Sequence, residues 1–199
     1  MSRTNIKFLD CAPRLRAFAR RIIKDMNNLQ VLHLTKIKTA IFVFAFTTLA
    51  ILTPMIFHYF GGQAAGRLFL PMHFFVLAGG LLLGWRAGLA VGILTPLISY
   101  SFTGMPPVMV LPFVVIEVAA YGFLAGLLQE KFKNIWLSLA GAMILGRMIL
   151  WLSIMVLPTK LSASPYVLGA LQSGWQGIAL QILLVPVVVI AVQKFLGND

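Results

Sequence analysis

The sequence predicts an all-α integral membrane protein, on three observations. The chain of 199 residues is 60% hydrophobic and only 11% charged, and its mean hydropathy is +0.94. Soluble domains carry about 25% charged residues, so this chain has too few charges to cover a soluble surface. Its apolar residues gather in long runs without strand alternation, and within lipid only helices or closed barrels satisfy their own backbone groups.

Six apolar segments each predict a membrane-spanning helix. They are 37–57, 70–84, 87–103, 107–128, 134–157 and 167–193. The second and third are short, roughly 22–26 Å at the helical rise, which indicates a locally thin or protein-covered region. We expect one transmembrane domain, 36–199. No cleavable signal peptide is evident, because the first long apolar run begins late and is long enough to span.

The distribution of basic residues predicts the orientation. If the N-terminus lies inside, the inner side has 13 Lys and Arg, nine of them before residue 39, and the outer side has two, Arg67 and Lys160. The sixteenth, Arg147, lies within a span. Cytoplasmic loops carry such an excess, so both termini are expected in the cytoplasm. The net charge of +11 is therefore explained by the membrane topology and by contact with anionic lipid, and it does not indicate binding to nucleic acid.

The segment 1–35 is basic, with apolar residues at helical spacing and arginines on the other face. An amphipathic helix lying in the cytoplasmic interface and a partly ordered basic tail fit this pattern about equally well. The single cysteine, Cys11, lies here without a partner, which excludes a disulfide framework.

The sequence contains no motif of a catalytic or metal site. Its only glutamates are Glu117 and Glu130, and its three histidines lack metal-ligand spacing. No nucleophile elbow, P-loop or dinucleotide-binding glycine motif is present. We therefore expect no enzyme activity, no metal and no cofactor.

Two charged residues fall within the predicted spans. Glu117 lies roughly 15 Å below the outer start of the fourth span, and Arg147 roughly 10 Å below the outer side in the fifth. Because these spans are consecutive and antiparallel, an ion pair between them is geometrically easy. It is either a structural link between two helices or the charged floor of a ligand pocket. Ionisable residues within membranes usually mark functional sites.

Further polar and aromatic residues at a similar depth favour the pocket. They are Tyr121, one turn from Glu117; Trp151, one turn from Arg147; His73, near the outer end of the second span; and Gln172, Trp175 and Gln176, on one face of the last span. Trp and Tyr also form interfacial belts, and Gln also bonds across helices. Together, however, these residues have the composition of a small-molecule site that opens outward.

Small residues indicate close contacts between helices. Gly80, Gly84, Gly88 and Gly92 follow GxxxG spacing across the turn at Arg86. This pattern predicts packing within the chain, with a docking surface for another membrane subunit as the alternative.

Two predicted outer loops connect the spans. The segment 58–67 is rich in glycine, and the segment 158–165 is polar. Ordinary connectors are the default interpretation, and a mobile lid over the site is the alternative for either loop.

With these residues described, the chain resembles the substrate-binding S components of energy-coupling factor (ECF) vitamin transporters. The resemblance covers roughly 65–155. It rests on LPMHFFVLAGGLLLGWRAGLAVG (70–92), TPLISYSFTGMPP (95–107), IEVAAYGFLAGLL (116–128) and GRMILW (146–151).

This resemblance implies a subunit of a bacterial-type plasma membrane that captures a vitamin or related micronutrient from outside. It implies partnership with a transmembrane coupling subunit and a pair of cytoplasmic ATPases. It also implies binding residues at Glu117, Tyr121, Arg147 and the outer face of the last helix, with 58–69 as a lid. One feature departs from the family, because many S components carry an Ala-x-x-x-Ala stripe on the first helix for the coupling subunit. Here Ala40, Ala45 and Ala50 are spaced by five.

Two other functions stay open. One is a stand-alone secondary transporter in which Glu117 carries the proton, and the other is a non-transporting membrane scaffold whose glycines recruit partners. The sequence does not identify the substrate, since a mixed-charge aromatic pocket suits a zwitterion, a carboxylate vitamin, a pyrimidine or a nucleobase-like compound.

Overall fold

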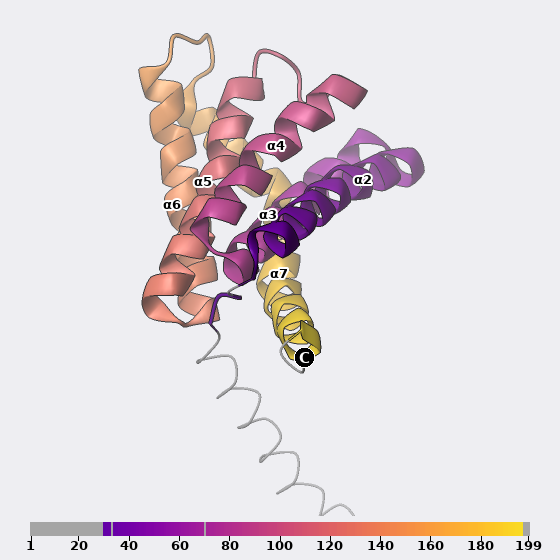
Figure 1. Cartoon of the computed structure of the whole chain (residues 1–199). Helices are drawn as coiled ribbons and strands as arrows, with labels where there is room; N and C mark the ends of the chain where they lie inside the picture. The colour runs from indigo at the N-terminus through magenta and orange to yellow at the C-terminus, as the bar shows by residue number, and fades with distance from the viewer. Residues whose placement is uncertain (1–29, 33, 70, 197–199) are drawn as a thin grey trace, which may run out of the picture.

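The computed structural model of the chain describes residues 30–32, 34–69 and 71–196, and this part contains helices and no strand (Figure 1). The helices are α2 (Lys36–Phe69), α3 (Pro71–Leu83), α4 (Trp85–Thr103), α5 (Leu111–Phe132), α6 (Ile135–Val156) and α7 (Ala163–Leu196). The prediction of an all-α architecture is therefore confirmed for the described residues. The segment 1–29, which contains Cys11 and most of the predicted amphipathic helix, lies outside them.

Four segments are long and apolar enough to cross a membrane. They are Lys36–Ile56, Leu111–Phe132, Ile135–Val156 and Ala163–Leu196. Met72–Leu83 is a shorter apolar helix, as the predicted short second span indicated. The chain is thus a multi-pass membrane protein, while membrane crossing by α3 and α4 stays a prediction.

The prediction of a loop at 58–67 is wrong, because α2 continues as a helix from Lys36 to Phe69. Glycine lowers helix propensity by about 1 kcal/mol but does not forbid a helix, and no proline interrupts the sequence between Pro54 and Pro71. The other predicted loop is shorter than expected, since α6 ends at Val156 and α7 begins at Ala163.

Local sequence explains where several helices end. The Asn134 side chain accepts hydrogen bonds from the backbone N–H groups of Trp136 (3.0 Å) and Leu137 (3.1 Å), a cap that satisfies free donors at the start of α6. Gly84, between α3 and α4, has φ 85°, a left-handed value that favours glycine. These ends produce the short turns that make α3, α4, α5 and α6 neighbours.

The predicted glycine contacts lie within the chain. A side-chain carbon at Gly80 or Gly88 would come closer than 3.0 Å to the carbonyl oxygen of Gly122 in α5, and one at Gly92 would meet the backbone of Val118 and Ala119 in the same way. Backbone contact of this kind requires residues without side chains. The glycines therefore hold α3 and α4 against α5, as the packing interpretation predicted.

The exposed face of α2 is apolar. Ile37 and Phe44 are each 75% exposed, and Ala40 is exposed as well, whereas Ala50 is fully buried. Ala40 and Ala50 thus do not form one stripe, which agrees with their spacing by five residues. This apolar face suits contact with lipid.

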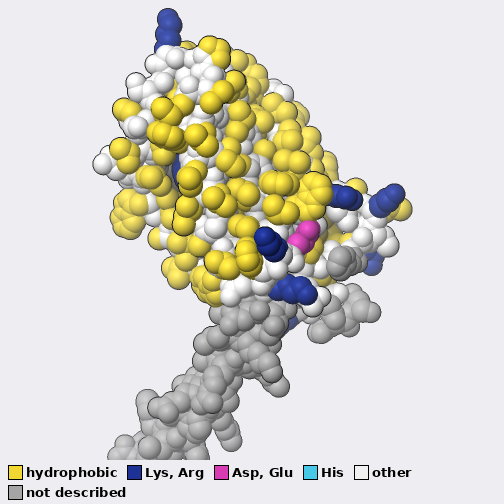
Figure 2. Space-filling view, turned by 90° about the vertical axis from the view of Figure 1, so that its left-hand side faces the viewer, with side chains coloured by type: hydrophobic (Ala, Val, Ile, Leu, Met, Phe, Trp, Pro, Cys, Tyr) yellow, Lys and Arg dark blue, Asp and Glu magenta, His cyan; other side chains and the backbone are white. Residues whose placement is uncertain are grey.

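Most described basic residues lie at one end of the bundle, which we call the basic end. It comprises Lys36, Lys38, Arg86, Lys131, Lys133 and Lys194. Figure 2 shows dark-blue side chains gathered at the lower end of the molecule, with an apolar surface above them. Lys160 lies in the loop between α6 and α7, at the opposite end.

Candidate functional site

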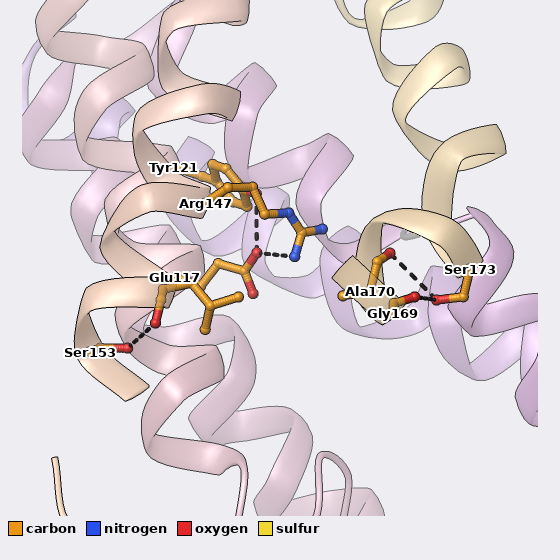
Figure 3. A network of polar contacts seen from close by, with 8 residues as sticks. Glu117, Tyr121, Arg147, Ser153, Gly169, Ala170 and Ser173 are labelled. Carbon is orange, nitrogen blue, oxygen red and sulfur yellow. Dashed lines mark hydrogen bonds and ion pairs between the residues drawn. The ribbon is translucent and has the colours of Figure 1, made fainter. Parts of the chain in front are cut away.

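An ion pair joins the middle of α5 to the middle of α6. Arg147 Nη1 lies 2.7 Å from Glu117 Oε1, and the same oxygen accepts a hydrogen bond of 3.0 Å from the Tyr121 hydroxyl (Figure 3). The side chains of Arg147 and Glu117 are only 13% and 7% exposed. The two charges thus compensate each other away from either end of the bundle, as the predicted depths indicated.

Two local features position this group of residues. Glu117 and Tyr121 are four residues apart on α5, which places them on the same face of the helix. Gly146, directly before Arg147, provides the space for the tyrosine ring, because a side-chain carbon there would come closer than 3.0 Å to two ring carbons of Tyr121. The ring therefore packs closely against α6 while its hydroxyl reaches the carboxylate.

His73 extends the site to α3. Its ring stands edge-on to that of Tyr121, with centroids 5.3 Å apart and an angle of 69° between the planes. His73 is only 9% exposed, and neither Nδ1 nor Nε2 has a hydrogen-bond partner. A buried polar group without a partner costs about 1–3 kcal/mol, so the imidazole is available for a bond that the protein itself does not make.

The four other predicted site residues lie on α6 and α7. Trp151 is 37% exposed, and its Nε1–H donates to Ser164 Oγ of α7 at 3.3 Å. Gln172 and Trp175 are exposed, Trp175 by 61%. Gln176 is half-buried, and its Oε1 is buried without a partner. The structure thus brings Glu117 and Arg147 together with Tyr121 and His73. It leaves Gln172 and Trp175 on the surface.

The guanidinium of Arg147 is directed toward α7. Figure 3 shows the Arg147 guanidinium pointing from α6 toward the turn of α7 that carries Gly169, Ala170 and Ser173. A side-chain carbon at Gly169 would have no heavy atom within 4 Å apart from its chain neighbours and its own helix backbone. The Ser173 hydroxyl is engaged by the Gly169 carbonyl at 2.9 Å. Gly169 and Ser173 are exposed, so the guanidinium, which carries five N–H donors, points toward a turn with small side chains and open space at Gly169 (Figure 3).

Sequence reasoning did not single out several buried polar residues. Gln129 of α5 is 1% exposed, Gln181 of α7 is 3% exposed and Ser138 of α6 is fully buried. A signal was present for Gln181, which interrupts an apolar run in the same manner as Glu117, whereas Gln129 stands at the end of its run, directly before Glu130 and Lys131. The two glutamines lie closer to the basic end and are not in the group around Arg147.

Within the described ranges, no group of three or more His, Cys, Asp or Glu side chains is arranged to hold a metal ion. The site offers several groups for non-covalent binding. It has a compensated pair of opposite charges, a phenol, and an imidazole with two unused nitrogens, all of which form directional bonds to a polar ligand.

Comparison with protein families identifies the family of this chain. The model of the family described as "ECF transporter, substrate-specific component" matches residues 35–189. This range covers α2 to α6 and most of α7, including every residue of the site. No curated protein and no solved structure matches the chain.

Proposed function

Because this chain belongs to the family of substrate-specific components of ECF transporters, we propose that it captures a vitamin or related micronutrient at the site around Glu117 and Arg147. Tyr121 and His73 complete the floor of this site. The chain is a transporter subunit, and its role in this proposal is binding rather than catalysis. The high-affinity site opens toward the end of the bundle opposite the basic end.

One observation carries the proposal: a buried ion pair lies beside a buried imidazole whose two nitrogens are unused. A purely structural pair needs no such neighbour, because an unpartnered polar group lowers stability. A ligand that bonds to His73 removes this cost. In the bound state, the ligand bridges Glu117 and Arg147 or replaces the contact between them.

The surrounding residues have supporting roles in this proposal. Trp151 and Gln176 form the side of the site near α7, and Gln172 and Trp175 lie at its rim.

The proposal includes an arrangement in the membrane. All six helices cross a bacterial-type plasma membrane, and the basic end faces the cytoplasm together with both termini, as the distribution of Lys and Arg favours. A transmembrane coupling subunit and two cytoplasmic ATPases then drive release of the ligand inward. The apolar exposed face of α2, with Ala40, contacts lipid or that coupling subunit.

A binding experiment tests the site. Purified protein is incubated with the small-molecule fraction of a cell extract and washed, and the compounds that it retains are identified by mass spectrometry. Affinity for the retained compound is then measured for Glu117→Gln and Arg147→Met. The matched control is Arg86→Met, which removes an arginine at the basic end. We expect both site variants to weaken binding by at least about tenfold, and Arg86→Met to bind as the wild type does. Unchanged affinity in both site variants would refute the proposed site.

Uptake measurements separate the two rival functions. A stand-alone secondary transporter accumulates substrate in vesicles that contain this chain alone, driven by a proton gradient. A non-transporting scaffold retains no small molecule, and its melting temperature does not respond to any. The proposal predicts retention by the chain alone, but accumulation only with the coupling subunit, the ATPases and ATP.

A further inference from the structure

The charges within the site sum to zero. Glu117 and Arg147 contribute one negative and one positive charge in direct contact. The other charged side chains that the structure describes lie at helix ends or in loops: Lys36, Lys38, Arg86, Glu130, Lys131, Lys133, Lys160 and Lys194. Apart from Glu117 and Arg147, no described Lys, Arg, Asp or Glu therefore lies near the middle of α5 and α6, where it could compensate an additional charge.

A ligand with a net charge would disturb this balance. An anion on Arg147 draws the guanidinium away from Glu117, and the carboxylate then keeps only its bond from the Tyr121 hydroxyl. A cation on Glu117 leaves the guanidinium without its counter-charge in the same way. In either case one uncompensated charge stays buried, a situation that is strongly unfavourable in a site of low dielectric.

The buried polar atoms without partners indicate which hydrogen-bonding groups a matching ligand carries. A neutral imidazole has one donor and one acceptor nitrogen, and both nitrogens of His73 are buried without partners. Oε1 of Gln176 is a third buried atom without a partner, and it is an acceptor. A matching ligand thus presents hydrogen-bond donors and at least one acceptor.

From these observations we propose that the captured nutrient is electroneutral as a whole, either uncharged or zwitterionic, and carries hydrogen-bond donors and an acceptor close together. The lactam or ureide edge of a heterocycle and an ammonium–carboxylate pair both have this chemistry. Simple carboxylate and simple ammonium compounds do not. The inference rests on the proposed function, because it assigns a class of ligand to the same site.

The first test is the identity of the compound retained by the wild-type protein from the small-molecule extract. The inference predicts a compound with no net charge at neutral pH. This measurement requires no variant, so it decides the question even where a substitution prevents folding. A retained compound with a net charge overturns the inference and leaves the proposed function intact. Retention of no compound overturns both.

The second test is a double-mutant cycle on the affinity for the pure retained compound. Its members are the wild type, Glu117→Gln, Arg147→Gln and the double variant, and Arg86→Gln is the matched control. For a neutral ligand, each single variant leaves one buried charge and weakens binding by about tenfold or more, whereas the double variant restores neutrality and binds better than the weaker single variant.

The opposite result is equally specific. If an anion is the ligand, Glu117→Gln binds it at least as well as the wild type, and Arg147→Gln loses as much affinity as the double variant. That pattern overturns the inference while supporting the site. Affinities that do not change in any member of the cycle place the ligand elsewhere and overturn both proposals.

Discussion

The contact between α4 and α5 offers a quantitative test of how the bundle positions its site. At Gly88, a side-chain carbon would come closer than 3.0 Å to both the carbonyl carbon and the carbonyl oxygen of Gly122. Because both are backbone atoms, no side-chain rotation relieves the contact, and Gly88→Ala has to separate two helices. Overpacking of this kind costs about 1–3 kcal/mol.

Alanine also has a higher helix propensity than glycine, by up to ~1 kcal/mol, and this gain has to be removed from the comparison. Gly169→Ala is the matched control, because Gly169 is also in a helix and a side-chain carbon there has no heavy atom within 4 Å apart from its chain neighbours and its own helix backbone. The propensity gain is common to both variants and cancels in their difference. We therefore expect Gly88→Ala to be less stable than Gly169→Ala by about 1–3 kcal/mol.

The assay is reversible unfolding in mixed micelles with increasing denaturing detergent, followed by circular dichroism, with the free energy of unfolding compared across the three proteins. Gly88→Ala also displaces α5, which carries Glu117, so ligand retention should fall together with stability. Equal stability of the two alanine variants would refute the close backbone contact from which this reasoning starts.

Three further predictions concern the ion pair, a helix cap and the turn of α7 that carries Gly169. Arg147→Met should lower the free energy of unfolding by about 3–5 kcal/mol, because the Glu117 carboxylate stays buried with only the tyrosine hydroxyl as a partner. Adding Glu117→Gln should recover most of this loss in the same unfolding assay, and no recovery in the double variant would contradict mutual compensation of the two charges. Asn134→Ala should cost about 1 kcal/mol through loss of the cap of α6, while Asn134→Asp keeps it; an alanine variant as stable as the aspartate variant would speak against the cap. Gly169→Leu should leave the free energy of unfolding unchanged or higher, but should abolish retention of the ligand by filling the open space on α7 toward which the guanidinium points. Retention at the wild-type level would show that the ligand does not lie against this turn.

The central ion pair could be predicted from the sequence because its signal is local. A single acid and a single base interrupt apolar runs on consecutive helices, and the antiparallel arrangement of neighbouring helices places them at similar heights. The close packing of the glycines followed from their spacing for the same reason, although the sequence did not say that Gly80 and Gly88 meet Gly122 while Gly92 meets Val118 and Ala119.

Other features depend on the tertiary arrangement and could not be predicted in this way. Periodicity placed Gln172, Trp175 and Gln176 on one face of α7, but the direction of that face depends on how the whole helix packs, and two of the three side chains are exposed. The isolation of the His73 nitrogens depends on every neighbour of the ring. The glycines of 58–67 predict a loop from local composition, but α2 continues through this segment as a helix because no proline interrupts it.

A structure of the protein with its retained ligand bound tests the central claim most directly. The account predicts ligand atoms within hydrogen-bond distance of Arg147 or Glu117 and of one His73 nitrogen, with the contact between the two charges bridged or opened. A ligand seated elsewhere, above an ion pair that is unchanged at 2.7 Å and an imidazole still without a partner, would contradict it.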